Sequence, residues 1–332
     1  MERRNNKNIL LIRFSSFGDV ILLRPVVDTL LKTYSDVIIW IVTDQKNESL
    51  FNHDPRIKFI GVDLNNNILQ ILRQIKTASN LTYFNGIYDL HNVIRSQFIR
   101  FFLKNKTHKI RVYLKERSRK KKIVQKKIKL IPLKHTTERY LDCLKVDFPK
   151  ISFNNILQSL SIKIRKEKII GVAPFSAHSS KQWELENYNH IFEKYNDYKI
   201  KIFAFGEQEK ILASKKFSQN DQVAIISEKM ELKEQIELIN KCCVFISMDS
   251  ANMHLASLTS TPVVSVWGPT HPFLGFGPLF NDHLIVQLND LQCRPCSVYG
   301  KINSNNLDCA KKSMTGISSK MVIDKLELAL KN

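Results

Sequence analysis

Short apolar segments alternate with amphipathic segments along the whole chain, and this alternation limits the folds that the chain can adopt. In the first half, residues 8–14, 37–43, 57–62 and 86–90 are apolar runs of strand length, whereas residues 20–34, 68–78 and 136–146 have helical spacing. Strands that are apolar throughout are buried on both faces, which is typical of parallel sheets covered by helices. The order strand, helix, strand therefore predicts an α/β fold with a doubly wound parallel sheet.

The second half repeats the pattern. The expected strands are residues 168–173, 199–205, 223–226, 244–247 and 262–266, and the expected helices are residues 187–195, 208–217, 232–241, 250–258 and 318–330. A chain of 332 residues is long for one hydrophobic core. We expect two domains, residues 1–155 and 165–332, with a terminal helix that could pack back on the first. In such sheets ligands bind beyond the carboxyl ends of the strands.

The chain is strongly basic, with 51 Lys and Arg against 31 Asp and Glu and a net charge of +20. Residues 104–129 hold 13 of the basic residues and a single acid, Glu116. Such an excess favours an anionic partner: nucleic acid, an anionic membrane face or a phosphorylated substrate. We expect no nucleic acid, because the run holds only Tyr113 as an aromatic residue for base stacking. The run is either a surface for anions or a solvated, mobile loop, and the sequence leaves both open.

Membrane and export signals are not found in the sequence. No apolar run approaches the roughly 18 residues that cross a bilayer, and the polar first residues do not resemble a signal peptide. We therefore expect a cytoplasmic protein whose six cysteines are reduced. Cys293, Cys296 and Cys309 lie close in sequence, but a closed structural zinc site needs four ligands. Neither His283 nor Asp308 has convincing spacing for the fourth, so a packed or redox-sensitive loop is favoured and no metal is expected.

Two expected strands are followed by polar segments whose side chains could take part in binding or catalysis. After the first strand, Gly18 permits close backbone approach and Asp19 faces the ligand edge, although the glycine pattern is not that of a dinucleotide fold. After residues 168–173, a loop rich in hydroxyl groups carries Lys181, a point charge suited to a diphosphate. The plainer interpretations are a helix cap for Asp19 and a solvated surface residue for Lys181.

A third polar segment follows residues 244–247. Asp249 and Ser250 stand where a helix is expected to begin, and its unpaired amide groups and dipole favour a phosphate. Either side chain is also a good helix cap. His254 lies about one turn into that helix, where a single histidine is usually structural.

The three segments, in this order, resemble glycosyltransferase family 9, which contains the ADP-heptose:lipopolysaccharide heptosyltransferases. The resemblance is carried by residues 9–20, by Lys181-x-Trp183, and by residues 248–256 followed by 262–270. It implies a GT-B fold, in which two Rossmann-like doubly wound domains face a central cleft. The acceptor would bind the first domain and the nucleotide-sugar donor the second. The implied reaction is inverting, metal-independent transfer of a sugar, with heptose from ADP-heptose as the expected donor, onto a lipopolysaccharide core or related glycolipid.

The resemblance also assigns roles to individual residues. Asp19 matches the catalytic base, and the family usually has glycine where this chain has Ala251. The remaining positions implied by the resemblance are Ser176 and Lys181 for the diphosphate, Glu207 for the ribose, Asp249, Ser250, Ala251 and His254 for the donor-side helix, and His91 and Arg95 for the acceptor. No cofactor is expected beyond the donor itself, and no Asp-x-Asp metal motif stands near the donor loop.

Other interpretations stay open at this point. The donor can be another nucleotide sugar, and the protein can be an inactive member of the family that acts as a scaffold. With an anionic glycolipid as acceptor, residues 104–129 would lie near the anionic cytoplasmic face of the inner membrane as a peripheral contact.

Overall fold

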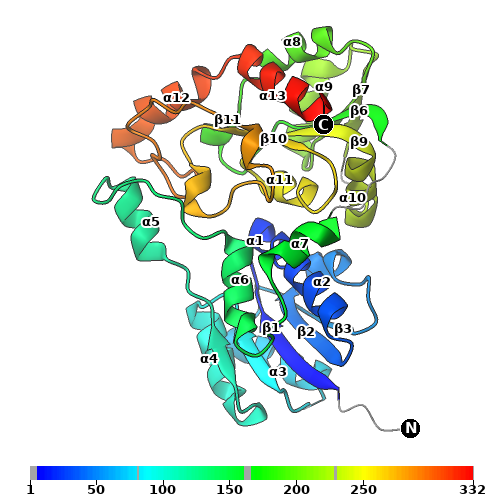
Figure 1. The fold of residues 1–332 in the computed structure, drawn as a ribbon, viewed down its shortest axis with the longest axis vertical. Coiled ribbons are helices and arrows are strands. Elements are labelled where there is room, and N and C mark those ends of the chain that lie inside the picture. Colours follow the sequence, from blue (N-terminus) through cyan, green and yellow to red (C-terminus); the bar gives the residue numbers. More distant parts are fainter. Residues whose placement is uncertain (1–5, 81, 161–165, 228–229, 332) are drawn as a thin grey trace. The chain divides into compact units, whose positions relative to one another are not determined.

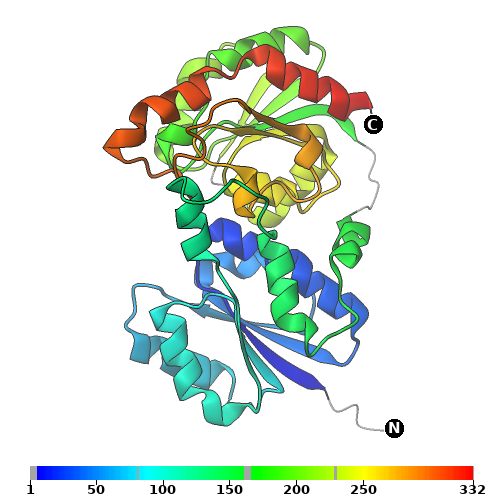
Figure 2. The ribbon, with the colours of Figure 1, turned by 60° about the vertical axis from the view of Figure 1, so that its left-hand side comes forward.

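The computed structural model describes residues 6–80, 82–160, 166–227 and 230–331, and its contacts divide the chain into two compact units (Figures 1 and 2). Unit 1 comprises Met1–Lys115 and Thr136–Ser159, and unit 2 comprises Glu116–His135 and Leu160–Asn332. The segment Glu116–His135 falls inside the range expected for the first domain but packs with unit 2. Residues 1–5, and part of the expected boundary between 155 and 165, lie outside the described residues.

Unit 1 is built on a five-stranded sheet of order β3-β2-β1-β4-β5, and all of its strand pairs are parallel. Residues Ile9 to Ile12 of the central strand are buried, as the apolar run predicts. The strands are β1 Lys7–Ile12, β2 Val37–Asp44, β3 Ile57–Val62, β4 Gly86–Asp89 and β5 Ile110–Val112. The sheet confirms the doubly wound parallel arrangement for this half.

Helices cover both faces of this sheet. Ile71, Ile75 and Ile99 pack with strand residues in one hydrophobic cluster, which places α3 and α4 together on one face. Helices α2 and α6 contact each other as well as β2 and β5 respectively. The helices of unit 1 are α1 Phe17–Ile21, α2 Arg24–Thr33, α3 Ile68–Ala78, α4 Ile94–Phe102, α6 Thr136–Lys145 and α7 Phe153–Leu160, with 3-10 turns η1 Gln45–Leu50 and η2 Lys104–Lys106.

The single helix expected over residues 20–34 is wrong, because the chain forms α1 and then α2. Pro25 stands in the first turn of α2. Proline is tolerated there, since the amide that it lacks would have no partner within the helix. A new helix therefore begins at Arg24, and the short α1 is left to carry Asp19.

Unit 2 is built on a six-stranded parallel sheet of order β11-β10-β9-β6-β7-β8. Its central strands β6 and β9 are buried along most of their length. The strands are β6 Glu167–Ala173, β7 Lys199–Phe203, β8 Val223–Ile226, β9 Cys242–Met248, β10 Val263–Trp267 and β11 Ile285–Gln287.

The terminal helix α13 packs within unit 2, and its expected packing on the first domain stays a prediction. Val322, Leu326 and Ala329 are buried in the core of unit 2, and α13 contacts α8, β9, β10 and β11. The helices of unit 2 are α5 Arg117–Val124, α8 Asn187–Lys194, α9 Glu207–Phe217, α10 Leu232–Lys241, α11 Ala251–Ala256, α12 Leu307–Thr315 and α13 Ser319–Lys331, with 3-10 turns at Ser179–Lys181 (η3), Pro272–Leu274 (η4), Asp282–Leu284 (η5) and Ser304–Asn306 (η6).

The basic run over residues 104–129 contains regular elements, so it is not a loop throughout, although most of its residues are exposed. It contains η2 and β5 in unit 1 and α5 in unit 2. Lys120 is 4% exposed, with Nζ 4.8 Å from the ring centroid of Phe276. Lys126 Nζ donates to the carbonyl oxygen of Arg294 at 2.6 Å. Among the helices described by the structure, none is both long and apolar enough to cross a bilayer.

Candidate functional site

Each sheet has one place where the strand order reverses. In unit 1 the chain moves outward from β1 through β2 to β3 and then returns to the other side with β4, so the switch lies between β1 and β4. In unit 2 it lies between β6 and β9 for the same reason. The loops that leave these strands diverge, which opens the crevice where doubly wound sheets bind ligands. Asp19 and His91 follow β1 and β4, while Lys181 and Asp249 follow β6 and β9.

Asp19 lies in the first turn of α1, with its carboxylate held from two sides. Its Oδ2 accepts a hydrogen bond from Ser16 Oγ at 2.9 Å and forms an ion pair with Arg13 Nη2. The side chain remains 33% exposed. Ser16 occupies the N-cap position but makes no side-chain cap bond. Asp19 is therefore neither the cap of this helix nor part of the core, and its carboxylate can be reached from solvent.

Arg13 is a residue of this site that the sequence interpretation missed. It is 3% exposed, directly follows β1, and its Nη1 donates to the carbonyl oxygen of Leu90 at 2.8 Å, so it bridges the switch point between β1 and β4. The Tyr140 hydroxyl donates to the backbone oxygen of Asp19 at 3.3 Å, and the same ring lies 5.9 Å from the Arg13 guanidinium. A charged residue directly after a fully apolar strand is the signal that could have identified it.

His91 and Arg95, the expected acceptor contacts, lie on the segment that follows β4. The backbone amide of His91 donates to Asp89 Oδ1 at 3.1 Å, and its ring lies 5.7 Å from that of Phe14. Asp89 is fully buried and also pairs with Arg100, so it fixes the turn that carries His91. Arg95 is half-buried in the first turn of α4. The structure places His91 at the switch point of unit 1, and the acceptor role stays a prediction.

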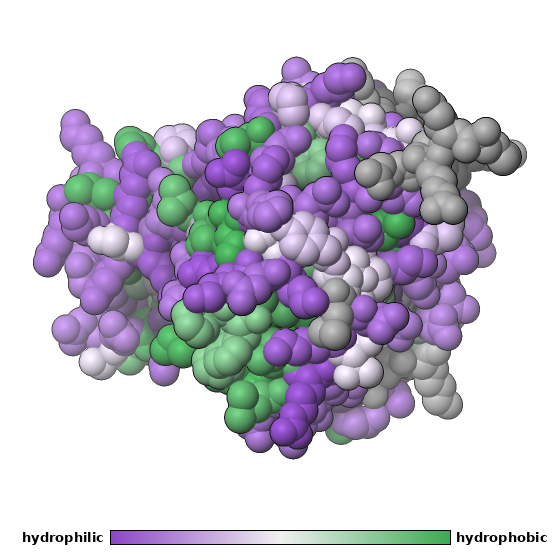
Figure 3. Space-filling model, turned by 90° about the horizontal axis from the view of Figure 1, so that it is seen from below, coloured by the Kyte–Doolittle hydropathy of each residue, from purple (hydrophilic) through white to green (hydrophobic). Residues whose placement is uncertain are grey.

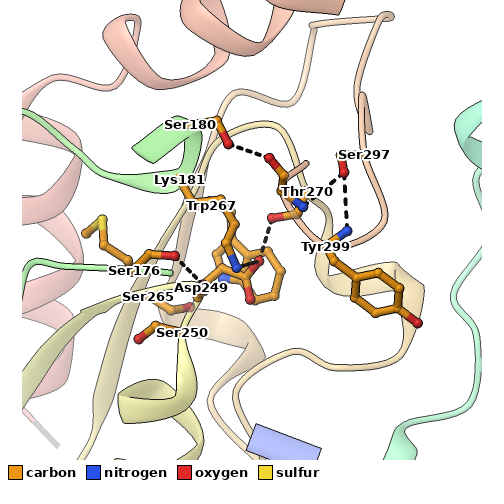
Figure 4. A network of polar contacts seen from close by, with 12 residues as sticks. Ser176, Ser180, Lys181, Asp249, Ser250, Ser265, Trp267, Thr270, Ser297 and Tyr299 are labelled. Carbon is orange, nitrogen blue, oxygen red and sulfur yellow. Dashed lines mark hydrogen bonds and ion pairs between the residues drawn. The ribbon is translucent and has the colours of Figure 1, made fainter. Parts of the chain in front are cut away.

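Asp249 joins the loops that leave three strands of unit 2 (Figure 4). Its Oδ2 accepts from Thr270 Oγ1 at 2.7 Å and from Lys181 Nζ at 3.2 Å. Its backbone oxygen accepts from Ser176 Oγ at 3.5 Å. Because a buried charge is costly unless it is paired, the pair fixes the Lys181 ammonium at the carboxyl edge. An ammonium has three donors, so Lys181 can bind a phosphate oxygen and keep its bond to Asp249.

Gly300 is a second residue of this site that the sequence did not reveal. Its φ is +107°, and a Cβ there would lie 3.0 Å from both Cδ and Cε of Lys181. The carbonyl oxygen of Gly300 accepts from Ser180 Oγ at 2.6 Å, and its amide donates to Ser297 Oγ at 2.9 Å. The glycine thus leaves room for the lysine stem and ties residues 297–300 to the loop after β6.

The helix after β9 begins at Ala251, with Ser250 as the preceding residue. Ser250 Oγ lies 3.3 Å from Ser247 Oγ and does not cap the helix. Ala251 has helical backbone, so replacing the family glycine imposes no positive φ and no strain. His254 is 7% exposed on the same helix.

Glu207 is the exposed first residue of α9, directly after the loop that follows β7. The neighbouring Glu209 accepts from the Phe205 amide at 2.9 Å through Oε2, and burial raises the pKa of Glu209. Glu209 therefore stabilises the turn, while Glu207 points a carboxylate outward. The ribose contact assigned to Glu207 stays a prediction.

The three cysteines of the loop near α12 come together. Cys293 and Cys309 form a disulfide, and Cys296 Sγ lies 2.9 Å from Cys309 Sγ. The expectation that all six cysteines are reduced is thus wrong for two of them. The fold brings the Cα atoms of Cys293 and Cys309 to 6.2 Å, a separation typical of disulfides. Sequence spacing could not show this, because residues between them form a loop that returns to α12.

Comparisons with known proteins agree with this architecture. The family model described as glycosyltransferase family 9 (heptosyltransferase) matches residues 81–306. Lipooligosaccharide heptosyltransferase 2 of Campylobacter jejuni is 26% identical over 287 residues, which cover 84% of this chain and 86% of the relative.

Two solved structures share the fold of both units. A family 9 glycosyl transferase from Veillonella parvula superposes with a TM-score of 0.71 at 19% identity, covering 99% of this chain and 98% of that one. An E. coli heptosyltransferase solved with ADP gives 0.69 at 15% identity, covering 97% and 99%. These likenesses confirm two Rossmann-like units of the GT-B type. The residues at both switch points were expected from the same family resemblance, and their individual roles stay predictions.

Proposed function

The chain belongs to glycosyltransferase family 9, and from this premise we propose that it transfers heptose from ADP-heptose onto a lipooligosaccharide or lipopolysaccharide core. Glycosyl transfer follows from the family; the donor, the inverting course and the independence from metal are the proposed part. The observation that carries the proposal is that both switch points hold groups suited to this reaction. The carboxylate of Asp19 lies at the switch point of unit 1, and the buried ammonium of Lys181 lies at the switch point of unit 2.

In the proposed reaction Asp19 is the general base. It accepts the proton of an acceptor hydroxyl while that oxygen forms a bond to the anomeric carbon of the donor. The bond from the anomeric carbon to the diphosphate breaks at the same time, so the configuration inverts and ADP leaves. A base must lie within about 3 Å of the hydroxyl, which its exposed carboxylate allows. Arg13 and Ser16 both hold Oδ2 and so orient the group.

In unit 2 the proposed role of Lys181 is to bind the diphosphate as negative charge grows on it. The ammonium is fixed by Asp249 before any ligand arrives, and fixed charges of this kind stabilise a transition state without reorganisation. Ser176 adds a hydroxyl at the same edge. Glu207, at the start of α9, is placed beyond β7, the strand beside β6, where it can reach a ribose bound across the edge.

The adenine nucleotide is the finer part of the proposal. It is supported by the heptosyltransferase relatives, one of them solved with ADP. Thermal unfolding with ADP, UDP and GDP tests it. ADP at a hundredfold excess over its dissociation constant should stabilise the protein by about 2.7 kcal/mol. UDP and GDP at the same concentration should stabilise it less. Stronger stabilisation by UDP or GDP would favour a transferase that uses a different nucleotide sugar.

A further inference from the structure

Helix α4 of unit 1 is apolar on the side that it turns to solvent. Its inner side is formed by Ile99, with Ser96 beside it, and packs into the core. Its outer side carries Ile94, Phe101 and Phe102, which are 81%, 59% and 43% exposed, and one exposed polar residue, Gln97. A surface helix of a globular protein normally shows charged and polar residues on the outer face. An unpartnered apolar stripe of this size indicates a surface that is covered by something else.

The aromatic rings of α4 form one cluster, in which Phe101 and Phe102 are exposed and Phe98 is partly buried against the core. Phe102 lies 4.5 Å from Phe98 and 5.4 Å from Phe101 between ring centroids. Lys104 Nζ lies 4.6 Å from the ring centroid of Phe101. Figure 3, which views the molecule from the end at which Figure 1 draws α4, shows a hydrophobic patch bordered by hydrophilic side chains.

The chain around this stripe is almost free of acids. Residues 64–115 contain one acid, Asp89, which is fully buried and paired with Arg100. The same stretch contains nine basic residues: Arg73, Lys76, Arg95, Arg100, Lys104, Lys106, Lys109, Arg111 and Lys115. Lys109 and Arg111 form ion pairs with Asp147, which lies just after the end of α6. Helix α3 and turn η2, which both contact α4, carry Arg73, Lys76, Lys104 and Lys106 and no acid, so basic residues border the apolar stripe.

We propose that α4 is a membrane-docking helix, which lies flat on an anionic lipid bilayer with Ile94, Phe101 and Phe102 inserted between the headgroups. Apolar and aromatic residues on one helix face, bordered by Lys and Arg, are the chemistry that binds such an interface. Negative lipids attract the basic residues within about one Debye length. The proposal rests on the proposed function in one respect, namely that the acceptor is a glycolipid.

The position of α4 gives this docking a purpose. Ile94 is three residues beyond His91, which follows β4 at the switch point of unit 1. A bilayer against the N-terminal end of α4 would therefore lie beside the edge that carries Asp19. The basic residues expected to meet the membrane were residues 104–129, but their second half belongs to unit 2. The proposed docking surface instead combines η2 with α4. The sequence pattern had predicted no helix at α4.

Vesicle flotation with the full-length protein tests the proposal. Binding is compared on phosphatidylcholine vesicles and on vesicles that also contain about 30% phosphatidylglycerol. We expect about tenfold stronger binding to the anionic vesicles, reduced at least tenfold by the double substitution Ile94→Ser with Phe101→Ser. Lys104→Glu with Lys106→Glu should also weaken binding, and about 1 M salt should remove most of the preference for anionic lipid.

Matched variants on unit 2 are the controls. Ile211→Ser with Leu307→Ser changes two apolar residues that are 60% and 57% exposed, and should leave binding unchanged. Lys311→Glu with Lys312→Glu makes the same charge change on exposed residues of α12. Equal loss in the control variants, or equal binding of the native protein to both kinds of vesicle, would overturn the proposal. So would loss of self-association in the α4 variant with unchanged vesicle binding, since α4 would then be an interface between copies.

The outcome can be separated from that of the proposed function. Vesicle binding needs no donor, and stabilisation by ADP needs no lipid. If the α4 variant keeps the response to ADP but the native protein ignores anionic vesicles, the docking surface is wrong and the transferase proposal stands. If the native protein binds anionic vesicles but ADP does not stabilise it, the docking surface stands and the proposed use of ADP-heptose is wrong.

Discussion

At the scale of single residues, the carboxylates at the switch points of the two units have different surroundings, which fit different proposed roles. Asp19 is partly exposed, whereas Asp249 is nearly buried and bonded to both Lys181 and Thr270. A buried, fully bonded carboxylate positions other groups, while an exposed one can accept a proton. This difference supports Asp19 as the proposed base, and Asp249 as the residue that holds Lys181 in place.

Replacing Asp19 with Asn should nearly abolish transfer. The amide is similar in shape but cannot accept the proton, and general-base catalysis contributes about 10²- to 10⁴-fold to a rate. Transfer is measured with ADP-heptose and a lipooligosaccharide acceptor, and binding by thermal shift with ADP. The shift with ADP should be unchanged. Asp36→Asn, which alters an exposed ion pair with Lys7 in the same unit, should leave the rate unaffected, and a rate loss there would speak against a specific role for Asp19.

Replacing Gly300 with Ala should weaken ADP binding and destabilise the protein. The positive φ costs an alanine about 1–2 kcal/mol, and the new Cβ would press on the stem of Lys181. Gly275→Ala is the matched control, because Gly275 also has a positive φ of 86° but ends the turn η4 instead of standing in the loop tied to Lys181. Calorimetric unfolding with and without ADP separates the two effects. An equal loss of ADP affinity in both variants would show that Gly300 has no particular role at Lys181.

At the scale of elements, the ends of strands and helices are joined by a few charged residues. Asp147, just after α6, accepts from Tyr88 of β4 at 3.0 Å and from Arg111 Nε of β5 at 3.1 Å, and it pairs with Lys109. Burial raises the pKa of Asp147, but hydrogen bonds from these three side chains lower it more, and the net shift is downward. One carboxylate thus joins β4 and β5 to the end of α6.

Replacing Asp147 with Asn should destabilise unit 1 by about 1–2 kcal/mol at neutral pH, a value kept low because Arg111 and Lys109 are partly exposed. The folded-state pKa lies below the ordinary value of 3.8. The stabilisation is therefore complete above that pH and is lost as the pH falls through the folded-state pKa. Urea unfolding at several pH values should show the two proteins converging in acid. Asp197→Asn, in an exposed pair with Lys168, should show no such difference, and a constant gap at all pH values would contradict this account.

At the scale of the whole molecule, the chain order and the folding units differ. Unit 2 includes Glu116–His135, which the chain inserts between two parts of unit 1. Within this insert, Lys120 lies over Phe276, and the Leu133 amide donates to the Phe273 carbonyl at 2.8 Å. A basic helix, α5, is therefore part of the unit that carries the proposed donor site.

Amide hydrogen exchange should reveal this division, because proteins open in cooperative units. In the Asp147→Asn variant, exchange should become faster in Met1–Lys115 and Thr136–Ser159 while Glu116–His135 stays protected. ADP should slow exchange in residues 174–183 and 297–300 of unit 2. Faster exchange of Glu116–His135 together with β1–β5 would show that the insert folds with unit 1.

The sequence by itself determined the two doubly wound sheets and most of the residues at their switch points. Its apolar runs of strand length match the buried strands. A strand of a parallel sheet is covered on both faces, so its residues are apolar at nearly every position, and such a run can be recognised in the sequence. Asp19, Lys181 and Asp249 could be chosen because each lies in the polar segment that follows such a strand, and because these segments resemble those of the family. Weak local patterns, as in α4 and β5, gave no prediction.

Only the tertiary structure decided how residues distant in the chain meet. Arg13 with Leu90, Gly300 with Lys181, and Cys293 with Cys309 are pairs whose contact depends on the packing of whole elements. The exposed apolar residues of α4 also became evident only from the structure, because the sequence does not show whether a hydrophobic residue is buried or exposed. Local patterns fix local structure, whereas contacts between elements depend on the three-dimensional path of the chain.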